Sequence, residues 1–203
     1  MGFYQNVILP HLIHLTMRRT DLVAYRQRVI PAAEGQVLEI GVGSGLNLPL
    51  YTDKVERVIG LDPSPKLLEM ARTVGSRAAR PVELLEGSAE AIPLEARSID
   101  TVVTTWTLCT IPDAGRALAE MRRVLKPGGL LLFVEHGRSP DRSVRGWQDC
   151  LNPLWKRIGG GCNLNRGIAE LIQTAGFRMG RLETGYMKGP KPMTFMYEGS
   201  ARP

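Results

Sequence analysis

The sequence predicts an α/β fold in which a single, mostly parallel sheet of seven strands is doubly wound, with helices on both faces. Short apolar runs alternate with helical stretches from residue 36 onward. Runs such as Leu130–Val134 are apolar at successive positions, which is typical of strands buried on both faces. A turn with glycines at 41, 43 and 45 follows the first run, as in open sheets that bind ligands at their carboxyl edge.

The alternation predicts the elements in order. Strands are expected at Val37–Ile40, Arg57–Leu61, Val82–Glu86, Ile99–Thr105 and Leu130–Glu135. Helices are expected between them at Pro65–Val74 and Ala114–Val124, and a turn at Lys126–Gly129. A helix is expected at Arg166–Thr174. An antiparallel pair of strands at Phe177–Thr184 and Met193–Glu198 is expected to complete the sheet.

Two segments flank this pattern within one expected domain of residues 1–203. Residues 1–30 read as an amphipathic helical cap, because Ile8, Leu12 and Leu15 share a helical face, and Pro10 is expected to kink the helix or begin its second half. Residues 36–135 are the expected cofactor-binding core. Residues 136–165, rich in Gly, Arg, Trp and Pro, are interpreted as an insertion on the substrate side.

Composition limits the classes of protein. With 43% apolar and 23% charged residues, the sequence is typical of a soluble globular protein. No apolar run reaches the roughly 20 residues of a membrane-spanning helix, and the N-terminus lacks a secretion signal, so the expected location is the cytoplasm. The three cysteines are widely spaced, which argues against a disulfide framework or a four-cysteine zinc site, and no metal is predicted.

The excess positive charge lies in the C-terminal third. Residues 1–137 hold 15 Lys and Arg against 15 Asp and Glu, whereas residues 138–203 hold 11 against 5. Such a region can attract an anionic membrane surface or an acidic substrate. It can equally be a solvated arginine-rich face, and both interpretations stay open.

The glycine-rich turn indicates a ligand. Its three glycines, Gly41, Gly43 and Gly45, let the backbone pass close to a nucleotide-like molecule. The dinucleotide pattern needs a glycine where Leu46 stands, so an NAD-dependent oxidoreductase is the weaker alternative. Glu39 favours the same conclusion, because a carboxylate beside the loop would repel a pyrophosphate and attract the ammonium and sulfonium groups of S-adenosylmethionine.

Further candidate cofactor residues follow the other strands. Asp62 ends the second strand, where its carboxylate can accept hydrogen bonds from both ribose hydroxyls or, alternatively, cap the helix that starts near Pro63. The third strand is followed by candidates for the adenine edge, Gly87, Ser88 and Ala89. The candidate set also includes Pro63 itself and Thr105 at the end of the fourth strand.

The order and spacing of five motifs resemble class I S-adenosylmethionine-dependent methyltransferases. These motifs are Val37–Gly45, Leu61–Asp62, Gly87–Pro93, Ser98–Asp100 and Val124–Gly129. The resemblance covers about residues 36 to 135. It implies that Glu39 and the glycines hold the methionine part of the cofactor, Asp62 its ribose, and the loop at Ser88 its adenine. The family often has Asp where Ser88 stands, so here the neighbouring amide is expected to serve the adenine.

The resemblance also narrows the acceptor. Class I enzymes that methylate amide or base nitrogens usually carry an Asn/Asp-Pro-Pro-aromatic motif where this sequence has Thr104–Thr107, so a nucleic-acid partner is not expected. The segments Leu108–Cys109, Val134–His136 and Gly161–Arg166 are similar to a group that includes mammalian thiol S-methyltransferases. The implied partner is a small or lipophilic methyl acceptor, preferably a thiol.

Other functions stay open beside this one. Bacterial phospholipid N-methyltransferases share the core, so phosphatidylethanolamine is the alternative acceptor. The amphipathic N-terminal helix and the basic C-terminal third would then allow a peripheral contact with an anionic membrane. A cofactor-binding module without turnover is a third hypothesis.

Two residues at the end of the fifth strand are candidate catalytic groups. Transfer from a sulfonium depends mainly on alignment, but a thiol acceptor reacts as its thiolate. His136, with an ordinary pKa of about 6.5, is the candidate proton acceptor and Glu135 the second, although His136 can instead be a turn residue bonded to backbone. Cys109 and Cys162 receive no chemical role. Four aromatic residues either line an acceptor pocket or fill the core: Tyr4, Trp106, Trp147 and Trp155.

Overall fold

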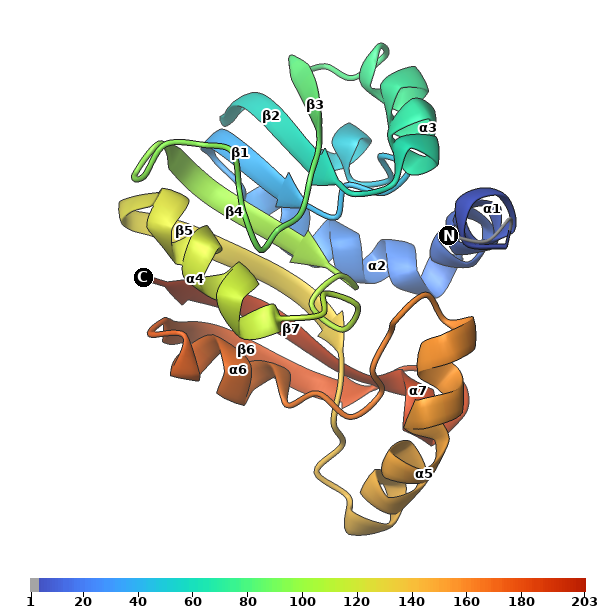
Figure 1. The fold of residues 1–203 in the computed structure, drawn as a ribbon. Helices are drawn as coiled ribbons and strands as arrows, with labels where there is room; N and C mark the ends of the chain where they lie inside the picture. The colour runs from blue at the N-terminus through green and yellow to red at the C-terminus, as the bar shows by residue number, and fades with distance from the viewer. Residues whose placement is uncertain (1–3) are drawn as a thin grey trace.

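A seven-stranded sheet forms the centre of the computed structural model, which describes residues 4–203 (Figure 1). The strands are β1 (Gly35–Ile40), β2 (Val55–Asp62), β3 (Val82–Glu86), β4 (Ile99–Thr105), β5 (Leu125–His136), β6 (Arg178–Tyr186) and β7 (Phe195–Arg202). Their order is β3-β2-β1-β4-β5-β7-β6; the first five pair in parallel, and β7 runs antiparallel to both β5 and β6. The predicted fold class is confirmed.

Helices cover both faces of this sheet. The helices of the structure are α1 (Leu9–Met17), α2 (Thr20–Val29), α3 (Pro65–Gly75), α4 (Ala114–Val124), α5 (Arg142–Ile158), α6 (Ile168–Thr174) and α7 (Lys191–Thr194), and α2, α3, α4 and α6 are those that pack on the sheet. Leu118 of α4 and Ile172 of α6 belong to the apolar core on one face, whereas Val29 of α2 and Leu68 of α3 belong to the core on the other. Short π- and 3-10-helical turns lie at Tyr4–Ile8, Ile30–Ala32 and Leu48–Leu50. None of the helices in residues 4–203 is long and apolar enough to cross a membrane.

Side-chain caps explain why two helices begin where the sequence predicts. The Ser64 hydroxyl accepts a hydrogen bond from the Leu67 amide at 3.4 Å, and Pro65 occupies the first turn of α3. The Asp113 carboxylate accepts from the Arg116 amide at 2.9 Å at the start of α4. The alternative that Asp62 caps α3 is therefore wrong, since Ser64 does so.

The N-terminal cap differs from the expected single helix. The chain breaks between α1 and α2, where Arg19 has an extended backbone (φ −58°, ψ 141°). Pro10 lies in the first turn of α1, a position that proline tolerates because the amide there needs no partner within the helix. Residues 1–3 of the predicted helix lie outside the described residues.

The segment after β5 contains a helix that the sequence reading missed. α5 spans 17 residues and has apolar residues at helical spacing, although only Val144 and Gln148 in it are buried. The Gly, Arg, Trp and Pro content of residues 136–165 was interpreted only as an insertion, and no helix was predicted there. At its other end, β5 begins earlier than predicted. Leu125 pairs with Ile99 and Leu130 with Thr101, so the predicted turn at 126–129 is a bulge inside the strand.

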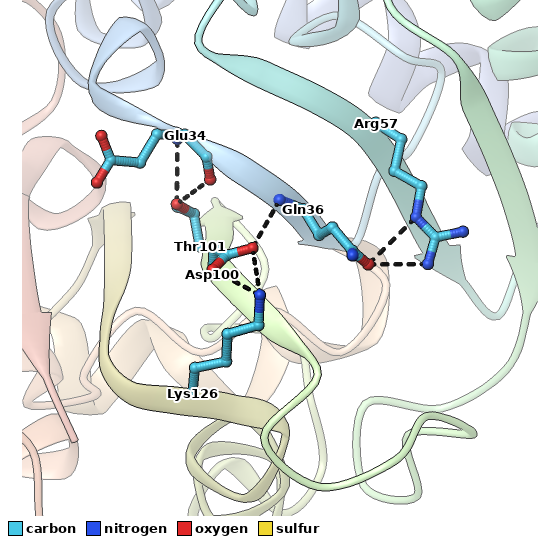
Figure 2. A network of polar contacts seen from close by, with 6 residues as sticks. All are labelled: Glu34, Gln36, Arg57, Asp100, Thr101 and Lys126. Atoms are coloured by element: carbon cyan, nitrogen blue, oxygen red, sulfur yellow. Dashed lines mark hydrogen bonds and ion pairs between the residues drawn. The ribbon is translucent and has the colours of Figure 1, made fainter.

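A polar network fixes the strands at the edge opposite the glycine turn (Figure 2). The Asp100 carboxylate accepts from the Gln36 amide at 2.9 Å and from Lys126 Nζ at 2.8 Å. Thr101 bonds to the backbone of Glu34, and Arg57 donates to the Gln36 side chain. Motif residues Asp100 and Lys126 thus join the beginnings of β1, β4 and β5, away from the candidate cofactor residues.

Candidate active site

Three glycines form the turn between β1 and the following 3-10 turn, and only one of them has free space where a side chain would be. Gly41, Gly43 and Gly45 all have positive φ angles, of 68°, 55° and 81°. A Cβ atom on Gly41 would lie 2.9 Å from Thr107 Cβ, and one on Gly45 would lie 2.9 Å from Leu48 Cδ1. At Gly43 the nearest atom would be 3.9 Å away. Close packing therefore accounts for Gly41 and Gly45, whereas Gly43 leaves space for a ligand.

Asp62 fastens this turn to the end of β2. Its Oδ2 accepts from the Gly43 amide at 2.9 Å and its Oδ1 from the Ser64 amide at 2.8 Å. The residue is 5% exposed, and burial raises the pKa of its carboxyl. Each oxygen retains a lone pair for a further donor. Asp62 therefore shapes the turn, a role that sequence reading did not foresee, and still presents acceptors at the sheet edge.

Glu39 lies buried beneath the same turn. Its Oε1 accepts from Asn47 Nδ2 and its Oε2 from the Tyr51 hydroxyl, each at 2.8 Å. Burial raises the pKa of Glu39 to about 7, despite these two hydrogen bonds and the opposing charge of Arg26, and the negative charge of Asp62 adds to the rise. An added cation beside this carboxyl would favour its ionised form.

Asn47 connects Glu39 with Thr105 at the end of β4. The Asn47 Nδ2 atom also lies 3.1 Å from Thr105 Oγ1, which accepts from it. Asn47 is 2% exposed, and its Oδ1 is a buried acceptor without a hydrogen-bond partner in the described part of the chain. An unpaired buried acceptor is costly, so this oxygen is suited to a donor supplied by a ligand.

The N-terminal helices lie on the side of the sheet to which the parallel strands point (Figure 1). His14 Nδ1 of α1 lies 2.7 Å from the hydroxyl of Ser44 in the glycine turn. Arg26 of α2 is 3% exposed, donates to the Met17 carbonyl at 2.9 Å, and stacks 4.7 Å from the ring centre of Trp106. Trp106 has a positive φ of 50°, an uncommon backbone state that often marks functional sites.

Arg26 is a site residue that sequence reading missed. Arginines late in an amphipathic helix are usually solvated, and only the packing of α2 against the sheet buries this one. Burial lowers the pKa of the Arg26 guanidinium to about 10, and the charge of Glu39 opposes that change. Its Nε atom has no hydrogen-bond partner among the described residues. The cap therefore brings a buried positive charge toward Glu39.

The expected adenine side follows β3. The Gly87 amide donates to the Asp62 carbonyl at 3.2 Å, which holds this loop beside the glycine turn. Ser88 is exposed, and its hydroxyl accepts from the Glu90 amide at 3.1 Å. The Ala89 side chain packs in the core, so only its backbone is available to a ligand. Pro63 is exposed at the end of β2.

Glu135 is buried completely and organises the loop after β4. Its Oε1 accepts from Thr104 Oγ1 at 2.9 Å, from the Thr107 amide at 3.0 Å and from the Leu108 amide at 3.1 Å. Burial raises the pKa of Glu135 to about 7. With no exposed surface, this carboxylate positions the loop and does not face solvent.

His136 contacts a sulfur atom. Its Nε2 lies 3.0 Å from Cys162 Sγ, which also accepts from Trp155 Nε1 at 3.3 Å, so the alternative of a backbone-bonded turn histidine is wrong. Cys109 completes the group: one ligand atom from each of Cys109, His136 and Cys162 lies within 4.8 Å of the others. A hydrogen bond from the Cys109 thiol and the contact with His136 lower the pKa of Cys162, whereas that bond and burial raise the pKa of Cys109.

The four candidate aromatic residues do not converge on one pocket. Trp155 contacts the sulfur cluster and Trp106 stacks on Arg26. Trp147 is 62% exposed on α5, and Tyr4 is exposed while donating to the Ile158 carbonyl at 2.8 Å. The first pair lies at the candidate site, and the second belongs to the surface.

Comparisons with known proteins decide the family. A family model described as a methyltransferase domain matches residues 38–133. The human thiol S-methyltransferase TMT1B is 33% identical over 176 residues, which cover 84% of this chain and 70% of the human protein. The chain is a class I S-adenosylmethionine-dependent methyltransferase. The predicted enzyme class and cofactor are thereby confirmed, and the oxidoreductase and non-enzymatic alternatives are set aside.

Other relatives differ in the acceptor their names state. Rat thiol S-methyltransferase TMT1B is 36% identical over 154 residues, and the methyltransferase spans 63% of its length, just under two thirds. The phosphatidylethanolamine N-methyltransferase of Cereibacter sphaeroides is 38% identical over 109 residues, 53% of each chain. Two solved methyltransferases share the fold: one from Thermotoga maritima (TM-score 0.67, 24% identity, 98% and 97% coverage) and one from Bacillus halodurans C-125 (0.69, 17%, 90% and 96%).

Proposed function

We propose that this methyltransferase transfers the methyl group of S-adenosylmethionine to the sulfur of a small or lipophilic thiol, at the carboxyl edge of β1, β2, β4 and β5. One observation carries the choice of acceptor. The three segments whose sequences resemble thiol S-methyltransferases, at Leu108–Cys109, Val134–His136 and Gly161–Arg166, supply the members of one cluster, in which sulfur and imidazole atoms lie within 4.8 Å. This cluster follows β4 and β5, on the side of the glycine turn.

The residues of the edge fit the methionine part of the cofactor. Asn47 Oδ1 lacks a donor, and Glu39 beside it favours a cation, so the α-ammonium group would satisfy both. Arg26 offers a buried positive charge to the α-carboxylate, and Thr105 keeps Asn47 in place. Gly43 admits the ligand close to the backbone.

The remaining candidates fit the adenosine part. Asp62 would accept from the ribose hydroxyls with its remaining lone pairs, beside Pro63. Gly87, Ser88 and the Ala89 amide would face the adenine. When bound, the cofactor supplies an activated methyl group for an in-line displacement, and its product is S-adenosylhomocysteine.

The chain's own contribution to the reaction is to orient the acceptor, exclude water and accept a proton. The acceptor thiol loses its proton, its sulfur forms a bond to the methyl carbon, and the electron pair of the broken bond leaves with the sulfur of the donor. We propose that His136 faces the acceptor and receives the proton in concert with Cys162, whose Sγ its Nε2 already contacts. Glu135 acts as a positioning residue through the loop at Thr107 and Leu108.

Cofactor affinity is expected to rise with pH up to about 7 because of Glu39. The pKa of this carboxyl in the free protein is about 7, so below that pH a bound ammonium group must displace a proton, at a cost of up to tenfold in affinity per pH unit. Calorimetry with S-adenosylhomocysteine between pH 5.5 and 7.5 measures this. Glu39→Gln should bind more weakly and without the slope, whereas the exposed control Glu34→Gln should keep both. An unchanged slope in Glu39→Gln would refute the role of Glu39.

The acceptor is tested with methyl-labelled S-adenosylmethionine and two parallel panels, one of alkyl thiols of increasing chain length and one of phosphatidylethanolamine vesicles. Label in the methyl thioether is the expected result, with a preference for the longer alkyl chains. Label in lipid alone would replace the thiol with the phospholipid acceptor. His136→Gln, compared with the surface control His11→Gln, should lower thiol turnover while leaving S-adenosylhomocysteine binding intact.

A lipophilic acceptor is also supported by an apolar surface at the N-terminal helices. Six side chains here are at least 40% exposed: Val7, Ile8, Leu12, Leu15, Leu154 and Ile158. The hydrogen bond from Tyr4 to Ile158 brings the end of α5 against the N-terminal segment. Exposed Arg18, Arg19, Lys156 and Arg157 accompany this apolar surface, a combination suited to an anionic membrane.

Vesicle flotation tests that contact. The wild type is expected to float with anionic vesicles and less so at high salt. Leu12→Ser combined with Leu15→Ser should weaken partitioning by about tenfold or more, because each leucine contributes roughly 1 kcal/mol or more when buried in the interface. Leu182→Ser, which removes a leucine that is 40% exposed on β6, is the matched control. Equal flotation of all three proteins would exclude this surface.

A further inference from the structure

Three potential metal ligands meet at the carboxyl edge of the sheet. Cys109 lies in the loop after β4, His136 ends β5, and Cys162 follows α5. One ligand atom of each lies within 4.8 Å of the other two. Cys109 is 1% and Cys162 9% exposed, and His136 is half-buried. Segments far apart in the sequence thus bring two sulfurs and an imidazole together in a place almost closed to water.

The surrounding contacts hold these atoms in place. The Asn163 backbone amide and its Nδ2 donate to the Cys109 carbonyl at 2.8 and 2.9 Å, which ties the segment of Cys162 to that of Cys109. Trp155 Nε1 donates to Cys162 Sγ, a contact that stabilises a thiolate. His136 Nδ1 has no partner among the described residues, so the contact with Cys162 orients the ring and directs Nε2 toward the sulfurs.

We propose that Cys109, His136 and Cys162 bind a zinc ion through their two Sγ atoms and Nε2, with the fourth position open to the sulfur of the acceptor. This inference rests on the proposed thiol methylation. Zinc prefers such nitrogen and sulfur ligands, and three protein ligands with one open position are typical of its catalytic sites. Usual zinc bond lengths place tetrahedral ligand atoms roughly 3.5 to 3.8 Å apart, so the 3.0 Å between His136 Nε2 and Cys162 Sγ would open slightly on binding.

The protons and charges balance in zinc binding and in the methyl transfer that follows. Zinc binding releases two protons, one from the Cys109 thiol and one from the Cys162–His136 pair, and the two thiolates neutralise the ion, while His136 binds neutral with its proton on Nδ1. An acceptor thiol that takes the fourth position is held as a thiolate, and its proton passes to solvent. In the zinc-loaded site the ion therefore replaces the proton acceptance proposed for His136, which is then a ligand. The acceptor sulfur then forms the bond to the methyl carbon as the bond from that carbon to the donor sulfur breaks. The resulting thioether is uncharged and binds zinc weakly, so it leaves.

Metal content tests the site without any assay of activity. The reduced protein, with all 203 residues, is loaded with zinc, desalted and measured by elemental mass spectrometry, and one zinc per chain is expected. Cys109→Ser and Cys162→Ser should each lose it, whereas Cys150→Ser, which alters the exposed third cysteine, should retain it. Because a variant can fail to fold, cobalt(II) is also titrated into the wild type, where thiolate-to-cobalt charge-transfer absorption should appear and change when an alkyl thiol is added.

The outcomes separate this inference from the proposed function. A folded, reduced wild type that retains neither zinc nor cobalt overturns the metal site, even if thiols are methylated. So does a protein two mass units lighter with Cys109 linked to Cys162 as a disulfide. Cobalt absorption that no thiol alters overturns the open fourth position. One bound zinc in a protein that methylates lipid alone supports the metal site and refutes the thiol acceptor.

Discussion

Asp62→Ala is expected to weaken S-adenosylhomocysteine binding by about 100-fold. The substitution removes the partners of the Gly43 and Ser64 amides and the acceptors proposed for the ribose hydroxyls. Loss of charge-assisted hydrogen bonds of this kind costs about 3 kcal/mol, which corresponds to that change in affinity. Isothermal titration calorimetry at pH 7.5 measures it.

Two control variants test whether the loss of S-adenosylhomocysteine affinity comes from the carboxylate of Asp62. Asp53→Ala removes a carboxylate from an exposed turn and should bind S-adenosylhomocysteine as the wild type does. Asp62→Asn, which keeps one acceptor oxygen, should fall between Asp62→Ala and the wild type. A folded Asp62→Ala protein with wild-type affinity would show that neither the ribose nor the glycine turn depends on this carboxylate.

Glu135→Ala should lower the free energy of unfolding by about 3 to 5 kcal/mol, because three donors around this fully buried carboxylate lose their acceptor at once. Glu135→Gln keeps an oxygen at the position of Oε1 and is expected to lose much less. Urea unfolding followed by circular dichroism gives both values. Glu86→Ala, at an exposed position that ends β3, is the control. Equal unfolding midpoints for Glu135→Ala and the wild type would contradict the role assigned to the loop contacts.

The elements that local sequence determines were predicted well. β3, β4 and α4 have the predicted bounds, and α3 extends one residue further, because the alternation of short apolar runs with helical stretches is visible in short windows. The glycine turn and Asp62 were recognisable for the same reason, since their motif is continuous. Their proposed roles toward the cofactor stay predictions.

The features that depend on distant contacts could not be predicted. α5 is an exception, because Val144, Leu151 and Ile158 recur in its sequence at helical spacing, and only the Gly and Pro content of residues 136–165 concealed that pattern. Arg26 is buried only because α2 packs on the sheet beside Trp106. The cysteines at 109 and 162 are separated by 53 positions, which conceals any ligand spacing, and only the closure of the segment after α5 brings them to His136. Local patterns indicate the half of the site proposed for the cofactor, whereas tertiary contacts assemble the half proposed for the acceptor.

A crystal structure with S-adenosylhomocysteine tests most directly whether methyl transfer takes place at this edge. The ribose hydroxyls should donate to Asp62 and the ammonium group to Asn47 Oδ1 beside Glu39, with the sulfur facing Cys109, His136 and Cys162. A cofactor bound at the same edge with its sulfur directed away from that cluster, or bound elsewhere on the chain, would contradict the account.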